Sequence, residues 1–416
     1  MPEDLKKAYR TMAGDPFPGR IEIAFVWDDE RSTLMYEKVT WVVDGERRGL
    51  RYGENPSQPA ALYKLVNGNL VLGNVETIAP GRFLVSDVEL LQSGKHPGKI
   101  NLTDADNALN ILRYLTGGPA AAIMKHNNPS GVAMGDSLVE AYLKADLADH
   151  VAAFGGCIAL NRPVDVATAE AISTRYAEVV VAPEYEAGAA GILARRQNLR
   201  IMRVGNMARL SEFAAERFVD LKSLVDGAVI AQLSYLPQVR TRADLRLAEA
   251  VHAGRTVRIA REPTEGEVQD MLFGWLVEAG VTSNSVLYVK DLATVGIGTG
   301  EQDRVGVAEI ARDKAYRKLA DRLAFEQHGV IYSALHDEAA RRAIDAQVAE
   351  QRGGLRGAVM VSDAFFPFRD GVEVGLKEGV TAVIQPGGAL NDYQVIEACN
   401  EVGATMVFTG ERSFKH

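Results

Sequence analysis

Cysteine is scarce in this chain. Only two of its 416 residues are cysteines, Cys157 and Cys399. Two are too few for a disulfide framework or a cysteine-rich zinc site, so we expect both to be small buried apolar residues. Long apolar runs are also lacking, since no stretch approaches the 18 residues of a membrane helix and the N-terminus is charged, unlike a signal peptide. The sequence therefore predicts a cytoplasmic protein without a membrane partner.

An excess of basic charge is lacking as well. The chain has 46 Lys and Arg against 55 Asp and Glu, which gives a formal net charge of −9. This balance disfavours a nonspecific nucleic-acid binder, although a local basic pocket could still hold a phosphate. The remaining composition, 47% hydrophobic and 24% charged, is typical of a folded globular protein with one large core or two to three smaller ones.

The most informative segment is Lys-His-Asn-Asn-Pro-Ser-Gly at 125–131. The apolar run 119–124 before it predicts a buried strand, and the Asn, Pro, Ser and Gly predict a turn directly after it. Ligands often bind at strand ends in α/β sheets. An imidazole can take a proton near neutral pH, and a neighbouring ammonium can stabilise negative charge on a carbonyl oxygen. Lys125 and His126 are therefore candidate catalytic residues, with a solvated surface pair as the alternative.

From about residue 100 onward, predicted helices and strands alternate. Thr103 is expected to cap a helix, and capping boxes are expected at Ser137 with Glu140 and at Thr264 with Glu267. The expected short strands are 156–160, 179–182, 199–204, 285–289, 358–361, 381–384 and 405–408. This alternation is typical of a layered α/β domain, with a second α/β unit beginning near 264.

Three further stretches bear on organisation. Residues 21–50 alternate apolar and polar side chains and predict a small β element around the acidic turn 28–30. Phe154 precedes a strand ending in Pro183, and Phe366 precedes one ending in Pro386, a parallel typical of a duplicated unit. Residues 308–352 are rich in Ala, Arg, Asp and Glu at helical spacing, so solvated helices are expected there.

Two motifs could bind anions. The segment 51–58 offers Arg51 to grip a phosphate and Tyr52 to stack on a flat ring. Gly-Ile-Gly-Thr-Gly at 296–300 looks like a phosphate loop, but it lacks both the dinucleotide-binding spacing and the Lys-Ser/Thr of a triphosphate loop. Its neighbours, Arg304 and the segment 283–285, supply donors that could fix a carbonyl or a carboxylate.

The segment 362–370 places three aromatic residues beside two carboxylates. Core packing of the aromatics is the simplest interpretation, and an aromatic cleft closed by Asp370 is the alternative. Gln-Pro-Gly-Gly at 385–388 precedes a predicted helix, so its backbone amides are expected near a helix N-terminus.

Taken together, eight motifs in one order closely resemble the AICAR transformylase domain of the bifunctional purine-biosynthesis enzyme, over roughly residues 50–416. They are Arg-Tyr-Gly-Glu-Asn-Pro at 51–56, Lys-His-Asn-Asn-Pro-Ser-Gly at 125–131, Ala-Phe-Gly-Gly at 153–156, Ser-Asn-Ser at 283–285, Gly-Ile-Gly-Thr-Gly at 296–300, Ser-Asp-Ala-Phe-Phe-Pro-Phe-Arg-Asp at 362–370, Gln-Pro-Gly-Gly at 385–388 and Arg-Ser-Phe-Lys-His at 412–416.

The resemblance implies an α/β fold of two cytidine-deaminase-like α/β/α subdomains with a small N-terminal β element. It also implies a homodimer with active sites at its interface, and formyl transfer from 10-formyltetrahydrofolate to the 5-amino group of AICAR. The zinc-binding signature of deaminases is absent, so no zinc site is expected. A bound monovalent cation stays open.

By the same resemblance, His126 would be the general base, and Lys125 and Asn284 would orient groups and stabilise the oxyanion. The implied AICAR-binding residues are Arg51, Tyr52, Asn101, Phe154, Gly155, Glu178, Arg412 and Phe414. The implied folate-binding residues are Arg304, Val305, Phe365, Pro367, Phe368 and Asp370. The family more often shows His at the positions of Ser57 and Ser413, which makes local contacts there less certain.

The expected organisation is an N-terminal extension at 1–48, a first subdomain at 49–240 and a second at 241–416. Because about 50 residues cannot supply a cyclohydrolase domain, we expect a transformylase without IMP cyclohydrolase activity, served by a separate cyclohydrolase. Two alternatives stay open. One is an AICAR-binding regulatory or scaffold protein without turnover, and the other is AICAR formylation with a different one-carbon donor.

Overall fold

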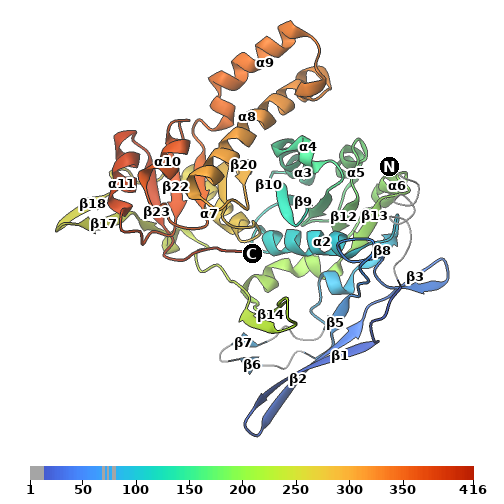
Figure 1. Ribbon diagram of the computed structural model, residues 1–416. Helices are drawn as coiled ribbons and strands as arrows, with labels where there is room; N and C mark the ends of the chain where they lie inside the picture. The colour runs from blue at the N-terminus through green and yellow to red at the C-terminus, as the bar shows by residue number, and fades with distance from the viewer. Residues whose placement is uncertain (1–13, 68–70, 73–74, 77–80) are drawn as a thin grey trace. The chain divides into compact units, whose positions relative to one another are not determined.

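The computed structural model of the chain describes residues 14–67, 71–72, 75–76 and 81–416. It has a mixed α/β fold that divides into two compact units, each built from two stretches of chain (Figure 1). The first unit comprises residues up to 116 and 155–236, and the second comprises 117–154 and 237–416. Among the described residues, no helix combines the length and apolar character needed to cross a bilayer.

A four-stranded array forms the core of the first unit. Its order is β11-β12-β13-β8, with the first three strands parallel and β8 antiparallel at the edge. The strands are β8 Glu89–Gln92, β11 Cys157–Leu160, β12 Val179–Ala182 and β13 Arg200–Arg203, and the helices are α2 Lys99–Leu112, α5 Val166–Ser173 and α6 Ala189–Ala194. Both faces of β11 and β12 are buried, as their continuous apolar sequences require.

Hairpins make up the rest of the first unit. The alternating residues of 21–50 form β1 Arg20–Trp27 and β2 Glu30–Lys38, which pair antiparallel around a turn at 28–29. The other strands are β3 Trp41–Val43, β4 Glu46–Arg48, β5 Tyr63–Leu65, β6 Val71–Leu72, β7 Val75–Glu76, β14 Val219–Ser223 and β15 Val229–Leu233. The small predicted β element is thus a hairpin extended by β5.

The sheet of the second unit has the order β16-β23-β22-β21-β19-β20-β10-β9. Its strands are β9 Ala120–Lys125, β10 Asn128–Met134, β16 Arg246–Leu247, β19 Val286–Lys290, β20 Ala293–Gly298, β21 Val359–Ser362, β22 Ala382–Gln385 and β23 Thr405–Phe408. Strands β21, β22 and β23 are parallel and the other pairs are antiparallel. A separate hairpin joins β17 Glu249–His252 to β18 Arg255–Arg258.

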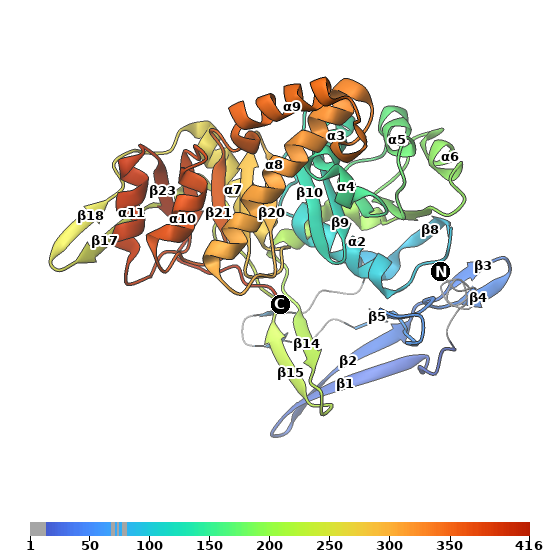
Figure 2. The same cartoon turned by 45° about the horizontal axis from the view of Figure 1, so that its top comes forward.

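Helices cover this sheet, except α9, which packs on α8. They are α3 Leu138–Ala148, α4 His150–Ala153, α7 Glu265–Glu278, α8 Arg304–His328, α9 Glu338–Glu350, α10 Arg369–Leu376 and α11 Asp392–Glu401. Helices α10 and α11 lie side by side near β21–β23 (Figure 2), and α7 packs on β21 and β22. Short 3-10 turns complete the two units at Val85–Asp87, Gly205–Ala215, Arg242–Asp244, Tyr332–Ala334 and Arg352–Gly354.

The glycine-rich segment 296–300 serves helix packing. A Cβ atom on Gly296 would lie 2.3 Å from the carbonyl oxygen of Ala311, and one on Gly298 would lie 2.2 Å from that of Val307. Only glycine allows α8 to approach β20 so closely. Gly296 and Gly298 lie inside β20 rather than in a loop, so the likeness to a phosphate loop is misleading.

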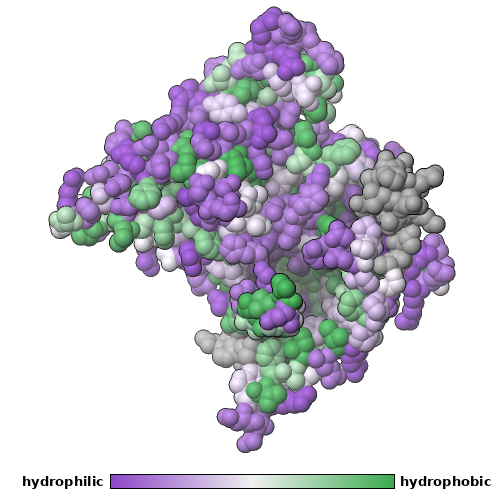
Figure 3. Space-filling view, in the orientation of Figure 1, coloured by the Kyte–Doolittle hydropathy of each residue, from purple (hydrophilic) through white to green (hydrophobic). Residues whose placement is uncertain are grey.

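The charged segment 308–352 is less solvated than expected. Helix α8 buries Ala308, Ala311 and Ala315 against the sheet, and its distal half packs Leu319 and Leu323 against Ile344 of α9. The hairpin of α8 and α9 is mostly hydrophilic on its outer surface (Figure 3). The prediction of helices is confirmed. The expectation that they are solvated is wrong for one side of α8, because alanines at helical spacing form a narrow buried face.

The order of elements repeats along the chain. Elements α2-β9-β10-α3-α4-β11-α5-β12-α6-β13 are followed by α7-β19-β20-α8-α9-β21-α10-β22-α11-β23. Aligning strand starts pairs Phe154 with Arg356, and not with Phe366 as the sequence indicated. Gly155 and Gly357 follow these two residues, and both have φ of 76°. The predicted duplication is therefore present in the element order, in a different register.

Most local predictions hold. Ser137 caps α3, Thr264 and Glu267 form a capping box on α7, and both cysteines are buried and free. Thr103 is not a cap, because α2 already begins at Lys99, where the Asn101 side chain accepts a hydrogen bond from the amide of Gly98. An asparagine inside the first turn replaced the Ser or Thr cap that the sequence pattern favours.

Candidate active site and adjoining cavity

The hairpin of β9 and β10 presents the two candidate catalytic side chains. Lys125 ends β9 and pairs with Asn128 at the start of β10, so the turn consists of His126 and Asn127 alone. Their φ angles are 54° and 62°, as a two-residue turn between twisted strands requires. Pro129 lies within β10, so the turn predicted through Pro-Ser-Gly is shorter than expected.

Lys125 and His126 differ in their surroundings. His126 is exposed, whereas Lys125 is half-buried and its Nζ donates a hydrogen bond to the carbonyl oxygen of Phe154 over 2.8 Å. Phe154 itself is 62% exposed. The structure thus brings three predicted site residues together in the second unit, and Lys125 keeps ammonium protons for a further acceptor.

The C-terminal segment lies beside this turn. Lys415 Nζ donates to the carbonyl oxygens of Asn127, over 3.4 Å, and Gly280, over 3.0 Å. The backbones of Lys415 and Ser283 are linked by a hydrogen bond of 2.9 Å. The guanidinium carbon of Arg412 lies 4.8 Å from the ring centroid of Phe414. Arg412 and Phe414 therefore belong to a segment held next to the predicted Ser-Asn-Ser motif.

Asn284 sits in a buried polar network. Arg304 Nη2 donates to Asn284 Oδ1 over 3.0 Å, and Arg304 Nη1 forms an ion pair with Asp363. The amide nitrogen of Asn284 donates to the carbonyl oxygen of Gln302 over 3.0 Å. Both polar ends of Asn284 are therefore engaged within the protein, but its amide nitrogen has a second proton to offer an acceptor.

A carboxyl that sequence reasoning missed lies next to this network. Glu278, the last residue of α7, is fully buried. Burial and the nearby charge of Asp363 raise the pKa of Glu278 well above its ordinary value. The apolar helix pattern gave no signal for an acid at this position.

The predicted folate-binding residues form a partly exposed surface around the start of α10. Phe365 and Phe368 are 37% and 56% exposed, whereas the intervening Phe366 is fully buried. Asp370 is exposed, and its Oδ1 accepts a hydrogen bond from the Gly371 amide over 2.8 Å. Core packing thus explains one of the three aromatics, and the other two leave an aromatic surface. The exposed Pro367 and the half-buried Val305 are the remaining members of this set.

Five of the predicted AICAR-binding residues lie in the first unit. Arg51 Nη2 donates to the Tyr52 hydroxyl over 2.9 Å, and Asn101 Nδ2 donates to Glu178 Oε2 over 3.4 Å. The fifth, Gly155, donates its amide to the carbonyl oxygen of Tyr176. Of the two residues that depart from the family pattern, Ser57 is exposed, whereas Ser413 is buried in the second unit.

Sequence reasoning missed Arg200, which connects this cluster. Arg200 is 1% exposed, forms a 3.3 Å ion pair with Glu178 and donates to the carbonyl oxygen of His96. Burial lowers the pKa of Arg200 from its ordinary value. The available signal was an arginine inside an otherwise apolar strand, which is typical of a buried functional or network charge.

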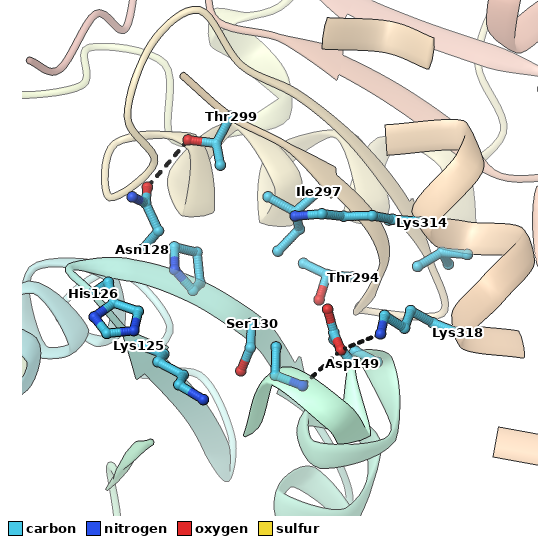
Figure 4. Close-up of a pocket in the computed structure, with 15 residues that line it drawn as sticks. Lys125, His126, Asn128, Ser130, Asp149, Thr294, Ile297, Thr299, Lys314 and Lys318 are labelled. Carbon is cyan, nitrogen blue, oxygen red and sulfur yellow. Dashed lines mark hydrogen bonds and ion pairs between the residues drawn. The ribbon is translucent and has the colours of Figure 1, made fainter. Parts of the chain in front are cut away.

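A cavity of about 230 Å³ adjoins the hairpin in the second unit. Figure 4 shows its lining from β10, β20, α4 and α8. Asn128 closes one end, where its Oδ1 accepts hydrogen bonds from the Thr282 amide and the Thr299 hydroxyl. The lining residues are Lys125, His126, Asn128, Pro129, Ser130, Ala148, Asp149, Ala152, Thr294, Val295, Gly296, Ile297, Thr299, Lys314 and Lys318.

Metal-ligating side chains were sought in the same part of the chain. Within the described residues, no three His, Cys, Asp or Glu side chains gather so that they could hold a metal ion.

Comparison with known proteins identifies the family. A family described as the AICARFT/IMPCHase bienzyme matches residues 21–314. The bifunctional purine biosynthesis protein PurH of Rhodospirillum rubrum is 41% identical over 370 residues, covering 89% of this chain and 60% of the relative. The proteins of that name from Magnetococcus marinus and Aquifex aeolicus are 37% and 38% identical, covering 93% and 88% of this chain and 61% and 59% of themselves.

These comparisons correct the expectation of a separate cyclohydrolase and support the family resemblance of the eight motifs. The expectation of a lone transformylase served by a separate cyclohydrolase is wrong, because the matching family is a bienzyme and these relatives are named as bifunctional proteins. This chain spans about 60% of the length of those relatives. The match of 294 residues and the identities above 30% place the eight motifs in one family, and the chain belongs to the AICARFT/IMPCHase bienzyme family.

Proposed function

We propose that this chain transfers a formyl group from 10-formyltetrahydrofolate to the 5-amino group of AICAR, giving FAICAR and tetrahydrofolate. The observation that carries the proposal is the exposed imidazole of His126, next to the Lys125 ammonium at a two-residue turn, in a member of this family. The transfer forms a bond between the amine nitrogen and the formyl carbon, breaks the bond from that carbon to the folate nitrogen, and moves one proton from the amine to the leaving nitrogen.

His126 is the proposed general base. An aromatic amine is a weak nucleophile, so removing its proton as the new bond forms lowers the barrier. Lys125 is anchored to the carbonyl oxygen of Phe154 and is the proposed partner of the developing oxyanion. Asn284 is the proposed second donor, through the amide proton that it does not give to Gln302.

The two binding sets complete the proposal. Arg51, Tyr52, Asn101, Phe154, Gly155, Glu178, Arg412 and Phe414 are proposed to bind AICAR, whose phosphate suits the arginines. Arg304, Val305, Phe365, Pro367, Phe368 and Asp370 are proposed to bind the folate. The exposed aromatics Phe365 and Phe368 are suited to stacking on a flat ring. The exposed Asp370 carboxylate is suited to accepting hydrogen bonds from amino groups.

Each copy of the repeated element order is proposed to be one cytidine-deaminase-like α/β/α subdomain. The copies fall within the predicted ranges 49–240 and 241–416, after an extension at 1–48, but the compact units divide the chain differently, because residues 117–154 with Lys125 and His126 belong to the second unit. The cytoplasmic location stays a prediction.

The test is tetrahydrofolate release from 10-formyltetrahydrofolate by the purified chain, with and without AICAR. Release that depends on AICAR is expected. AICAR binding without release would instead indicate a protein without turnover, and formylation of AICAR from another one-carbon donor alone would indicate the different-donor alternative.

A further inference from the structure

The cavity beside the hairpin has an unbalanced charge. Three ammonium groups line it, those of Lys125, Lys314 and Lys318, against the single carboxylate of Asp149. Two of the three ammonium groups have partners, because Lys125 donates to Phe154 and Lys318 lies 2.9 Å from Asp149 and 3.7 Å from Asp321. Because the carbonyl contact of Lys125 leaves its charge unbalanced, the excess of positive charge is shared by Lys125 and Lys314.

Lys314 has no such partner. It is half-buried on α8, and within the described part of the chain its ammonium makes neither a hydrogen bond nor an ion pair. Figure 4 shows Lys314 reaching from α8 over the cavity, whereas Lys318 turns toward Asp149. Burial lowers the pKa of Lys314 from its ordinary value, which means that its charge is poorly solvated.

Asp149 offers this ammonium only a shared charge. Its Oδ1 caps α4 by accepting the Ala152 amide and also lies 2.9 Å from Lys318, while the charge of the carboxylate also acts on Lys314. The hydroxyl protons of Ser130 and Thr299 are directed to the carbonyl oxygens of Ile123 and Thr282. A ligand that brings its own negative oxygen atoms matches a half-buried ammonium whose one lining carboxylate is shared.

We propose that this cavity is an anion-binding site in which Lys314, assisted by Lys318, binds the carboxylate or phosphate oxygen atoms of a small polyanion. The cavity of about 230 Å³ is larger than a single phosphate group needs, since one water occupies about 30 Å³ of liquid. A compound with two or three acidic groups on a short carbon chain fits this space. The proposed catalytic pair Lys125 and His126 also lines this cavity, so the site adjoins that of the proposed formyl transfer, and its assignment rests on the charge and geometry around Lys314.

The experiment compares binding of inorganic phosphate and of tricarballylate, a tricarboxylate, to the purified chain by calorimetry and thermal unfolding. Ionic strength is held constant with chloride. The wild type is expected to bind and to melt at a higher temperature in at least one of these anions. Lys314→Met should weaken binding at least tenfold, the scale of one lost charge-assisted hydrogen bond.

Two control variants sharpen the result. Lys222→Met removes the same charge from exposed strand β14 and should bind like wild type, and Lys314→Arg should restore most of the affinity. In chloride, Lys314→Met should unfold at the same or a higher urea concentration than wild type, because it removes a poorly solvated charge. If this variant fails to fold, Lys314→Gln replaces it.

The outcomes separate the ligand classes. Binding of phosphate alone supports a phosphoryl ligand, binding of tricarballylate alone supports a polycarboxylate, and binding of both supports the shared anion chemistry. Equal melting temperatures of the wild type in chloride and in both anions would overturn the proposal. So would unchanged affinity in Lys314→Met.

Discussion

The hairpins β9–β10 and β19–β20 have the same backbone conformation at their turns but carry different side chains there. Each first strand ends in a lysine, Lys125 or Lys290. The ammonium of Lys125 donates to the carbonyl oxygen of Phe154 over 2.8 Å, and that of Lys290 donates to the carbonyl oxygen of Arg356 over 2.9 Å. These two carbonyls occupy equivalent places, three residues before β11 and β21. The lysine contact is therefore a property of the repeated scaffold.

The two turns are equivalent in conformation as well. His126 and Asn127 have φ of 54° and 62°, and Asp291 and Leu292 have 53° and 56°. In the second hairpin the carboxylate of Asp270 accepts both turn amides, over 3.0 and 2.7 Å. Only the first turn carries an imidazole. The turn conformation and the lysine contact therefore recur in both copies, and the imidazole of His126 is the difference between the turns.

Replacing His126 should have the largest effect. His126→Asn keeps a residue that tolerates the left-handed conformation but removes the general base. Turnover should fall about a hundredfold or more, with AICAR binding little changed. The measurement is steady-state kinetics of tetrahydrofolate release.

Asp291→Asn is the matched control, because it creates the same side chain at the equivalent turn. Its turnover should equal that of wild type. Equal activity in His126→Asn would remove the imidazole from the mechanism.

Replacing the paired lysines should separate structure from catalysis. Lys125→Met and Lys290→Met each lose one hydrogen bond to a backbone carbonyl, so each should lower the free energy of unfolding by about 1 kcal/mol. Only Lys125→Met should also reduce turnover, by roughly tenfold or more, through a weaker contact with the oxyanion. Urea unfolding and kinetics on the same samples test both statements, and similar turnover in the two variants would make Lys125 purely structural.

Removing Asp270 tests how the second turn is held. Asp270→Ala leaves the amides of Asp291 and Leu292 without their acceptor, so the free energy of unfolding should fall by about 2 kcal/mol. Urea unfolding is the measurement, and Asp313→Ala on the exposed side of α8 is the control. A stability loss no larger than that of the control would show that water replaces the carboxylate.

The last residues of the equivalent helices α2 and α7 differ, and this difference should appear in the pH dependence of stability. Both α2 and α7 have 14 residues, and they end in Leu112 and Glu278. Because the folded-state pKa of Glu278 is raised, the unfolded chain releases this proton first as pH rises above about 4.5. Wild-type stability should then fall with rising pH, by at most about 1.4 kcal/mol per pH unit from this group.

Glu278→Gln should remove that contribution. The free energy of unfolding of the variant, relative to wild type, should be larger at pH 8 than at pH 5 in urea titrations. A difference that does not vary with pH would mean that Glu278 has the same pKa in both states.

Elements that depend on neighbouring residues could be predicted from the sequence. The apolar run at β9, the Ser137 cap and the Thr264 capping box depend on neighbours within a few residues, so their patterns were sufficient. The pairing of Lys125 and His126 as one site also followed from their adjacency. The repeat was visible only through Pro183 and Pro386, and its register needed the strand ends.

Long-range contacts were beyond the sequence pattern. Gly296 and Gly298 looked like a phosphate loop because nothing local reveals that α8 returns to lie against them. Arg200 and Glu178, or Lys314 without a partner, acquire their meaning from charges that lie far away in the chain. The roles of Asn284 and of the folate-binding set still rest on resemblance, since their bound geometry depends on substrates.

The contact of α8 with β20 also limits how the cavity can adapt. The carbonyl oxygens of Ala311 and Val307 lie against the α-carbons of two glycines, which leaves this wall no clearance for movement toward β20. Lys314 follows Ala311 by less than one turn, so its anchoring point is fixed. This wall of the cavity should therefore keep its position when a ligand binds, so that any adjustment falls on the side chains that line it.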